Sequence, residues 1–226
     1  MQKRFFTLGI AVFLAVSTSA QIGGSGIYSF LKVPIAPRVA GVAGNVIANT
    51  SDDVNFGMWN PALINPEMHG NMSMSLVSLT GDVLFGEAVY SHTFKKAGSF
   101  LAGVKYVDYG TMQHTNQQGQ VSGNFFAADY AFQLGYGYRL DSNFQVGSSL
   151  KIINSTYETY NSWGLAMDFS GVYQIPKSGL AMALILRNVG VQLSSFEGTR
   201  EPLPLQIDYG ISTRFKHVPL RLNLMF

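Results

Sequence analysis

The sequence predicts an all-β protein, an antiparallel β-barrel that spans a membrane. Three observations predict this class. Bulky side chains alternate with small or polar ones through the stretch Asp129–Leu140, and nine strand-like runs follow one another from Asn71 onward. Charged residues make up 12% of the chain, about half of the roughly 25% that is typical of soluble domains.

The stretch Asp129–Leu140 gives the clearest pattern. Its even-numbered positions from 130 are bulky, whereas the positions between them are small or polar and include glycine twice. A period of two indicates a β-strand, and this contrast between faces is typical of a wall between lipid and a lumen. The alternation in this stretch and in the run Ser162–Gln174 predicts which residues face lipid. They are Tyr130, Phe132, Leu134, Tyr136, Trp163, Leu165, Met167 and Phe169.

Residues 1–20 read as an export signal. Lys3 and Arg4 precede an apolar run, Phe5–Val16, and small residues end the segment at Ala20. The apolar run is shorter than the roughly 20 residues that a membrane-spanning helix needs. Removal of this segment leaves equal numbers of basic and acidic residues, which gives no reason to expect a nucleic-acid partner. The chain has no cysteine, so disulfides and thiolate metal sites are excluded.

Residues 21–70 differ from the rest. Four prolines interrupt this segment, together with the small-residue run Val39–Gly44. Proline excludes long helices and central strands. We expect an irregular plug-like segment with a short helix or two, inside the barrel or beneath it.

Residues 71–226 carry the predicted transmembrane strands. Most runs approach or exceed the roughly 9–11 residues that a tilted strand needs to cross a bilayer. The runs are Asn71–Leu79, Val83–His92, Ser99–Tyr109, Asp129–Leu140, Phe144–Ser155, Ser162–Gln174, Leu180–Val189, Leu205–Arg214 and Leu220–Phe226.

The predicted connections alternate between short and long. Outer-membrane barrels have short periplasmic turns and longer external loops, so the short connections predict which end of the barrel is periplasmic. We expect the plug-like segment at that same end. The short connections are Thr93–Gly98, Asp141–Asn143, Ile175–Gly179 and Phe215–Pro219. The longer ones, expected to contact partners, are Gly110–Ala128, Thr156–Asn161 and Gly190–Pro204.

The nine predicted strands are an unusual number, because bacterial single-chain barrels have an even number of strands. On the same assignment the ninth strand ends at the external side. We therefore expect either that the barrel is C-terminally truncated in this sequence or that the count is wrong by one strand.

Candidate catalytic and metal-binding residues are sparse. His69, His92, His114 and His217 share no metal-ligand spacing. The pair Asp52-Asp53 reads as a capping or solvated loop, and Gly41 to Gly44 lacks the lysine of a phosphate loop. Aromatic residues at strand ends, Tyr106, Tyr109, Tyr136 and Tyr138, read as an interfacial girdle rather than a ligand groove. We predict no catalytic residue, metal or cofactor.

Two sets of residues carry a family resemblance. The run Pro37–Gly44, followed by Asp52-Asp53 and Asn60-Pro61-Ala62-Leu63, resembles the N-terminal region of FadL-like outer-membrane barrels. The longer run Asn60–His69, with Arg200–Pro204 downstream, resembles the PorQ family of type IX secretion systems. The motif residues are Asn60, Pro61, Ala62, Leu63, Asn65, Pro66, Glu67, Arg200, Glu201 and Pro202.

The PorQ resemblance implies a function in the bacterial outer membrane. It implies a non-catalytic component that anchors the cell-surface attachment complex, which processes secreted cargo and joins it to lipopolysaccharide. The implied partners are outer-membrane lipid, a PorZ-like surface protein, PorU-like and PorV-like proteins of the complex, and lipopolysaccharide. The alternative is a FadL-like channel for hydrophobic small molecules. A secreted soluble β-sandwich or an enzyme would need a charged outer face or a convergent polar site, and the sequence predicts neither.

Overall fold

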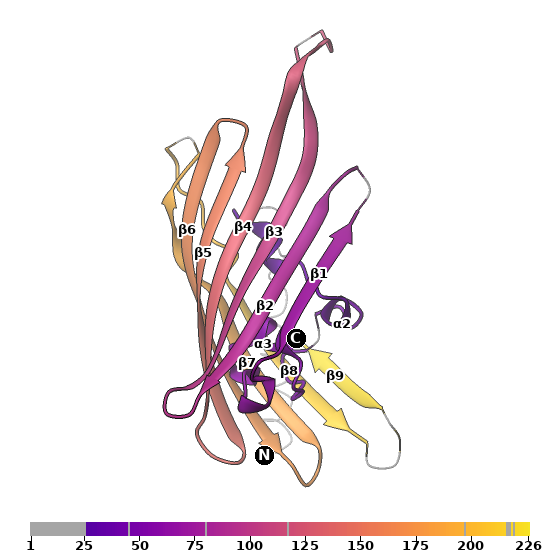
Figure 1. Cartoon of the computed structure of the whole chain (residues 1–226), viewed down its shortest axis with the longest axis vertical. Coiled ribbons are helices and arrows are strands. Elements are labelled where there is room, and N and C mark those ends of the chain that lie inside the picture. The colour runs from indigo at the N-terminus through magenta and orange to yellow at the C-terminus, as the bar shows by residue number, and fades with distance from the viewer. Residues whose placement is uncertain are drawn as a thin grey trace, which may run out of the picture.

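The computed structural model describes residues 26–44, 46–79, 81–116, 118–196, 198–215, 218 and 220–226. They form a nine-stranded antiparallel sheet whose strands lie in chain order (Figure 1). The predicted all-β antiparallel class is confirmed, whereas the predicted signal peptide lies outside the described residues. The strands are β1 (Met72–Ser78), β2 (Leu84–Phe94), β3 (Gly98–Thr115), β4 (Val121–Arg139), β5 (Phe144–Tyr157), β6 (Tyr160–Ile175), β7 (Leu180–Ser194), β8 (Gln206–Arg214) and β9 (Arg221–Met225).

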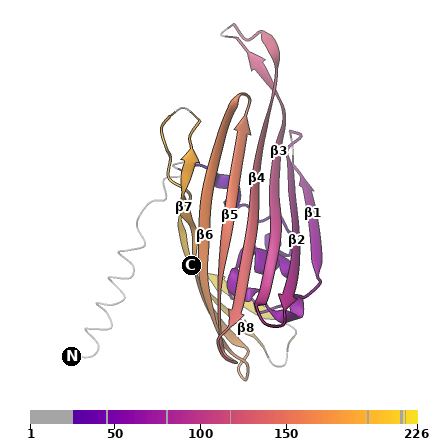
Figure 2. The same cartoon turned by 60° about the vertical axis from the view of Figure 1, so that its left-hand side comes forward.

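In the described part of the chain, five short helices precede the sheet, and the sheet curves around them (Figures 1 and 2). They are the 3₁₀-helices η1 (Ser29–Lys32), η2 (Pro61–Leu63) and η3 (Pro66–Met68) and the α-helices α2 (Pro37–Ala40) and α3 (Val54–Trp59). Proline stands at the start of α2, η2 and η3, where its missing N–H costs no hydrogen bond. Within the described residues, no helix has the length and apolar character needed to cross a membrane.

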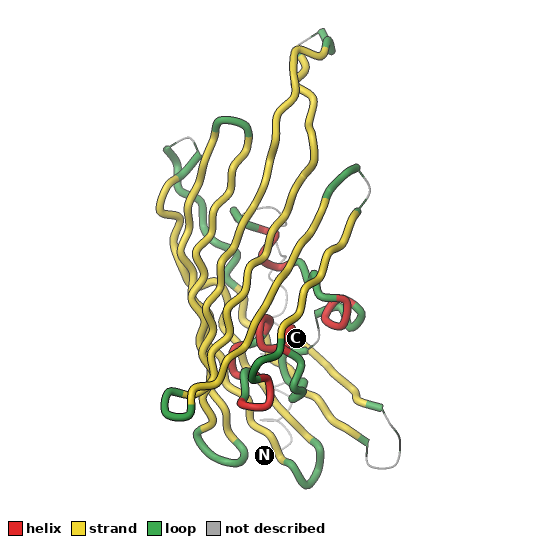
Figure 3. The backbone as a smooth tube through the Cα atoms, viewed as in Figure 1, coloured by secondary structure: helices red, strands yellow, loops and turns green. Residues whose placement is uncertain are grey.

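The sheet is not closed. Among the described residues, β1 pairs with β2 alone and β9 pairs with β8 alone, so each leaves one edge without a strand partner. Figure 3 shows the strands as long neighbouring tubes, with most of the helices on the concave side and α2 beside the open edge at β1.

Two predicted long loops are strand instead. The segment Gly110–Ala128 continues the β3–β4 hairpin, whose pairing runs on to Thr115 opposite Val121. The segment Thr156–Asn161 closes in a tight turn, because Tyr157 pairs directly with Tyr160. Their polar residues suggested loops, but polar side chains do not prevent a ladder whose hydrogen bonds are made by the backbone. Of the three predicted long connections, Gly190–Pro204 is the one whose described residues include a long stretch outside the strands, which begins after Ser194.

The two faces of the sheet differ as the alternation predicts. On β4, Phe132 and Leu134 lie on the convex face and are each 54% exposed, whereas Gln133 between them is 6% exposed on the concave face. The same alternation of exposed apolar and buried polar residues recurs on β6, where Phe169 is exposed and Asp168 is buried. The convex face is therefore mainly apolar, and most of the charged side chains of the strands point inward.

The concave face packs on the N-terminal segment, residues 26–70. Three apolar clusters join the two parts: one around Ile47 and Leu63, one around Tyr28 and Ile153, and one around Met68 and Leu101. The core of the molecule therefore lies between the segment and the sheet.

The N-terminal segment follows the length of the sheet. The Ile27 N–H donates to the Pro202 carbonyl in the β7–β8 loop, and the Gly70 N–H donates to the Ser91 carbonyl of β2 near the opposite end. We call the end with the β1–β2, β3–β4, β5–β6 and β7–β8 connections the upper end, as in Figure 1. The expectation that this segment lies only at the end with the short turns is wrong, because its first contacts are at the upper end.

Candidate functional site

The contact between the N-terminal segment and the sheet depends on glycines. Gly137 of β4 and Gly147 of β5 are register partners. A Cβ at Gly147 would overlap the backbone of Pro61 and Ala62, and a Cβ at Gly137 would overlap the Ile64 carbonyl. We call Gly135, Gly137 and Gly147 the glycine surface. It lets backbone pack directly on backbone, so the small residues of the β4 pattern are explained by this contact.

Asn60 fixes the chain where it meets the glycine surface. Its side chain is fully buried, accepts from the Ala62 N–H at 3.0 Å and donates to the Ile47 carbonyl. The Ala62 N–H also donates to Ser170 Oγ of β6 at 2.9 Å. Asn60 therefore caps η2 and ties it to the preceding loop.

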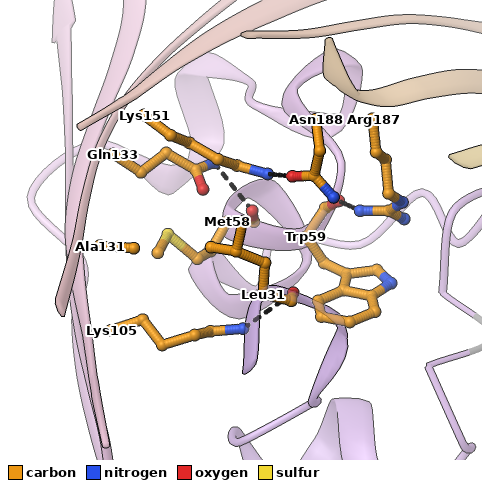
Figure 4. Close-up of a pocket in the computed structure, with 9 residues that line it drawn as sticks. All are labelled: Leu31, Met58, Trp59, Lys105, Ala131, Gln133, Lys151, Arg187 and Asn188. Atoms are coloured by element: carbon orange, nitrogen blue, oxygen red, sulfur yellow. Dashed lines mark hydrogen bonds between the residues drawn. The ribbon is translucent and has the colours of Figure 1, made fainter. Parts of the chain in front are cut away.

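Polar side chains of the sheet bind the backbone carbonyls of the N-terminal segment (Figure 4). Lys105 Nζ donates to the Val33 carbonyl at 2.9 Å, and Gln133 Nε2 donates to the Met58 carbonyl at 2.9 Å. Arg187 donates to the Trp59 carbonyl, and its guanidinium lies 4.7 Å from the centre of the Trp59 ring. Gln133 and Arg187 thus satisfy carbonyls at the C-terminus of α3, which the helix itself leaves unpaired. Lys105 satisfies the carbonyl that follows η1.

Buried ion pairs balance the inward-facing cations. Lys151 lies 2.7 Å from Asp168, Arg187 lies 2.8 Å from Asp208, and Lys105 lies 4.0 Å from Glu87. Asp168 is 1% exposed and also accepts from Ser149 and from the Asn188 N–H. Buried charges are tolerated when they are paired and hydrogen-bonded in this way.

The interior at this level is closely filled. A cavity of about 20 Å³ remains between Trp59, Lys105, Lys151, Arg187 and their neighbours. This volume is close to that of a single water site. The arrangement can hold the segment in place, but the residues at this level leave no room for a hydrophobic solute.

The second part of the predicted motif, Arg200 to Pro202, lies at the upper end. The Glu201 N–H donates to Gln192 Oε1 at 2.8 Å, and the Pro202 carbonyl accepts from Ile27. Tyr28 shares a hydrogen bond of 2.7 Å with Ser162. Burial raises the pKa of the Tyr28 phenol, so the hydroxyl remains protonated at neutral pH.

The structure thus brings both motif regions to the interface between segment and sheet. Asn60, Pro61, Ala62, Leu63 and Asn65 are buried there, whereas Pro66, Glu67, Arg200, Glu201 and Pro202 are exposed at the ends. Glu67 faces Arg139 at 3.8 Å. The sheet residues that bind the segment were not predicted as a site. Their sequence signal is a charged or amide side chain at an inward position of a strand, as at Lys105, Gln133 and Arg187.

The eight residues predicted to face lipid all lie on the convex face. Phe132, Leu134, Trp163, Met167 and Phe169 are exposed, and Tyr130, Tyr136 and Leu165 are half-buried between their neighbours. Contact of these side chains with lipid stays a prediction.

The remaining candidates have local structural contacts. Asp53 caps α3 through the Asn55 N–H and pairs with Arg38 at 2.6 Å. The rings of His69 and His92, far apart in sequence, lie 4.6 Å apart. His217 is outside the described residues. Among the residues that the structure describes, no group of three or more acidic or histidine side chains is placed to hold a metal ion.

The chain matches no protein-family model and no curated protein. The resemblance to PorQ and FadL-like barrels therefore depends on the motif residues alone.

Replacement of Asn60 by alanine should destabilise the fold by about 2 kcal/mol, because it leaves the buried Ile47 carbonyl without its donor. Urea unfolding of the full chain in detergent micelles measures this loss. The matched control is Asn116→Ala in the exposed β3–β4 turn, where the same change should cost under about 1 kcal/mol. Equal losses at both positions would show that the Asn60 contacts contribute nothing specific.

Proposed function

We propose that the chain forms the wall and plug of an outer-membrane β-barrel that anchors the attachment complex of a type IX secretion system. The observation that supports it most is the convex face, where many large apolar side chains of the strands are exposed while the ion pairs between the same strands are buried on the inner face. Soluble proteins rarely expose an apolar surface of this extent, whereas a wall in contact with lipid requires it.

Aromatic side chains on the convex face support the same proposal. At the lower end, Phe94, Phe100 and Tyr136 form a chain of ring contacts at 5.7 and 4.9 Å. Farther up, Tyr106 and Tyr130 lie 4.8 Å apart. Tyr130 and Tyr138 are separated by about 26 Å along β4, or about 20 Å in height for a strand tilted by roughly 40°. This is of the order of the roughly 25 Å apolar band between aromatic girdles.

The anchoring role is supported by the motif resemblance and by the shape of the upper end. The β3–β4 hairpin projects beyond the other strands there (Figure 2). Partners contacting this end would be a PorZ-like surface protein and the PorU-like and PorV-like proteins of the complex. The channel alternative has less support, because the N-terminal segment packs on the concave face along the sheet.

The two edges of the open sheet need hydrogen-bond partners in a membrane. Unpaired backbone groups cost several kcal/mol each in hydrocarbon, and no strand among the described residues pairs with the outer edges of β1 and β9. In a bilayer both edges must therefore be paired.

Two arginine substitutions on β4 test whether the convex face of this strand lies in the membrane. Phe132→Arg should destabilise the protein in lipid vesicles by about 2–4 kcal/mol, because its side chain would meet the hydrocarbon core. Phe126 is the control: it lies on the same strand and face, and it is exposed in the projecting hairpin. Phe126→Arg should cost under about 1 kcal/mol. Equal effects in the two variants would contradict the membrane placement.

Affinity purification from outer membranes tests the anchoring role. Recovery of a PorZ-like partner with the chain supports it. Recovery of a bound hydrophobic molecule without any partner protein would support the channel instead.

A further inference from the structure

A second cavity lies at the upper end, away from the glycine surface. It has a volume of about 410 Å³ and is lined by Tyr157, Tyr160, Phe196, Thr199 and Glu201. Tyr157 and Tyr160 are register partners on β5 and β6, and the other three residues come from the β7–β8 loop. We call this cavity the mouth pocket.

Three aromatic rings form much of its wall. The Tyr157 and Phe196 rings meet edge to face with their centres 5.3 Å apart. Tyr160 is 44% exposed, so part of its ring remains free. Faces of aromatic rings attract cations through their quadrupole, and Glu201 adds an exposed carboxylate to the same wall.

A buried carboxylate lies behind the pocket. Asp129 is 2% exposed and accepts from the Tyr109 hydroxyl at 2.6 Å and the Tyr157 hydroxyl at 3.0 Å. Among the described side chains, none of the Lys, Arg or His residues comes within 4.0 Å of Asp129 or Glu201 in an ion pair. The inward-facing cations described above all have carboxylate partners of their own.

Two carboxylates, Glu201 in the wall of the mouth pocket and Asp129 behind it, favour positive charge in the pocket. A buried carboxylate is usually paired with a cation, and two tyrosine hydroxyls supply hydrogen bonds to Asp129 without supplying charge. Because Tyr157 donates to Asp129, electron density in its ring increases, which strengthens the attraction of the ring face for a cation. Both effects favour a positively charged ligand over a neutral one such as a saccharide.

We propose that the mouth pocket binds an arginine or lysine side chain of a partner protein. The cation lies against the aromatic wall formed by Tyr157, Tyr160 and Phe196, and Glu201 pairs with it at the rim. The identity of the partner as a protein of the attachment complex rests on the proposed function, whereas the preference for a cation does not.

Binding of a small probe tests the preference. The probe is Nα-acetyl-arginine methylamide, titrated into the full chain in detergent micelles and followed by NMR. Its neutral counterpart carries citrulline in place of arginine. The arginine probe should bind saturably and at least about tenfold more tightly than the citrulline probe. Equal affinity for the two probes, or tighter binding of maltose, would overturn the proposal.

Two variants locate the probe. Glu201→Gln and Phe196→Ala should each weaken arginine binding by about five- to tenfold. The control is Glu158→Gln, which removes an exposed carboxylate from the neighbouring β5–β6 turn and should leave the affinity unchanged. Circular dichroism of each variant verifies its fold, and Glu201→Gln is nearly isosteric. Undiminished binding by this variant would exclude the mouth pocket as the site.

The two proposals can fail separately. Cation-selective binding without a partner protein in the outer-membrane purification would refute anchoring and leave the pocket assignment intact. A recovered partner that is retained equally by the wild-type chain and by Glu201→Gln would support anchoring and remove the mouth pocket from the interface.

Discussion

Replacement of Gly147 by alanine is expected to displace the N-terminal segment from the sheet and to destabilise the fold by about 3 kcal/mol or more. This is the upper end of the cost of overpacking. The added methyl group would overlap the backbone of Pro61 and Ala62, which cannot rotate away as a side chain could. The loss is measured by urea unfolding of the full chain in detergent micelles.

Trp59 reports on the same displacement. It lies in the segment against Lys105 and Arg187, and a Trp163→Phe background leaves it as the single tryptophan. Its emission should shift to longer wavelength in Gly147→Ala. The control is Gly123→Ala in the projecting hairpin, where a Cβ would meet no atom within 4 Å. A Gly147→Ala protein with wild-type stability and emission would show that the segment does not rest on this glycine.

Replacement of Lys151 by methionine should destabilise the fold by about 3–5 kcal/mol. The substitution leaves the buried Asp168 carboxylate without its nearest cation, and an unpaired buried charge is strongly destabilising. Urea unfolding in micelles at neutral pH gives the magnitude.

A double variant separates this explanation from a loss of packing. Lys151→Met with Asp168→Asn removes both charges and keeps an acceptor for the Asn188 N–H. It should recover most of the stability lost in Lys151→Met, because uncharged replacement of a buried ion pair is often close to neutral. If the double variant is as unstable as the single one, uncompensated charge is not the cause.

The strand faces were predictable because the alternation has a single physical origin. Successive side chains point to opposite faces of a strand, so the pattern of Phe132, Gln133 and Leu134 gives both the strand and its orientation. The nine predicted runs correspond to nine strands for the same reason. Their ends were less predictable. The backbone pairs across β3 and β4 well beyond the apolar region, and a polar strand such as Thr111–Thr115 has the composition of a loop.

The candidate site was only partly predictable. The motif Asn60 to Leu63 was recognised, and its proline content indicated an irregular segment. Its contact with Gly137 and Gly147 depends on the register of β4 against β5, which a single sequence does not specify. The same is true of Arg187, whose bond to the Trp59 carbonyl joins residues 128 positions apart.

The path of the N-terminal segment limits the order of events during folding. Its residues contact β2 through Gly70, β4 and β5 through Pro61–Ile64, and β7 through Trp59. Once the two open edges of the sheet are joined into a closed wall, a segment held by so many strands could not be threaded in without breaking most of these bonds. The strands are therefore expected to assemble around a segment that is already folded back among them, so that it acts as a template for the curvature of the wall.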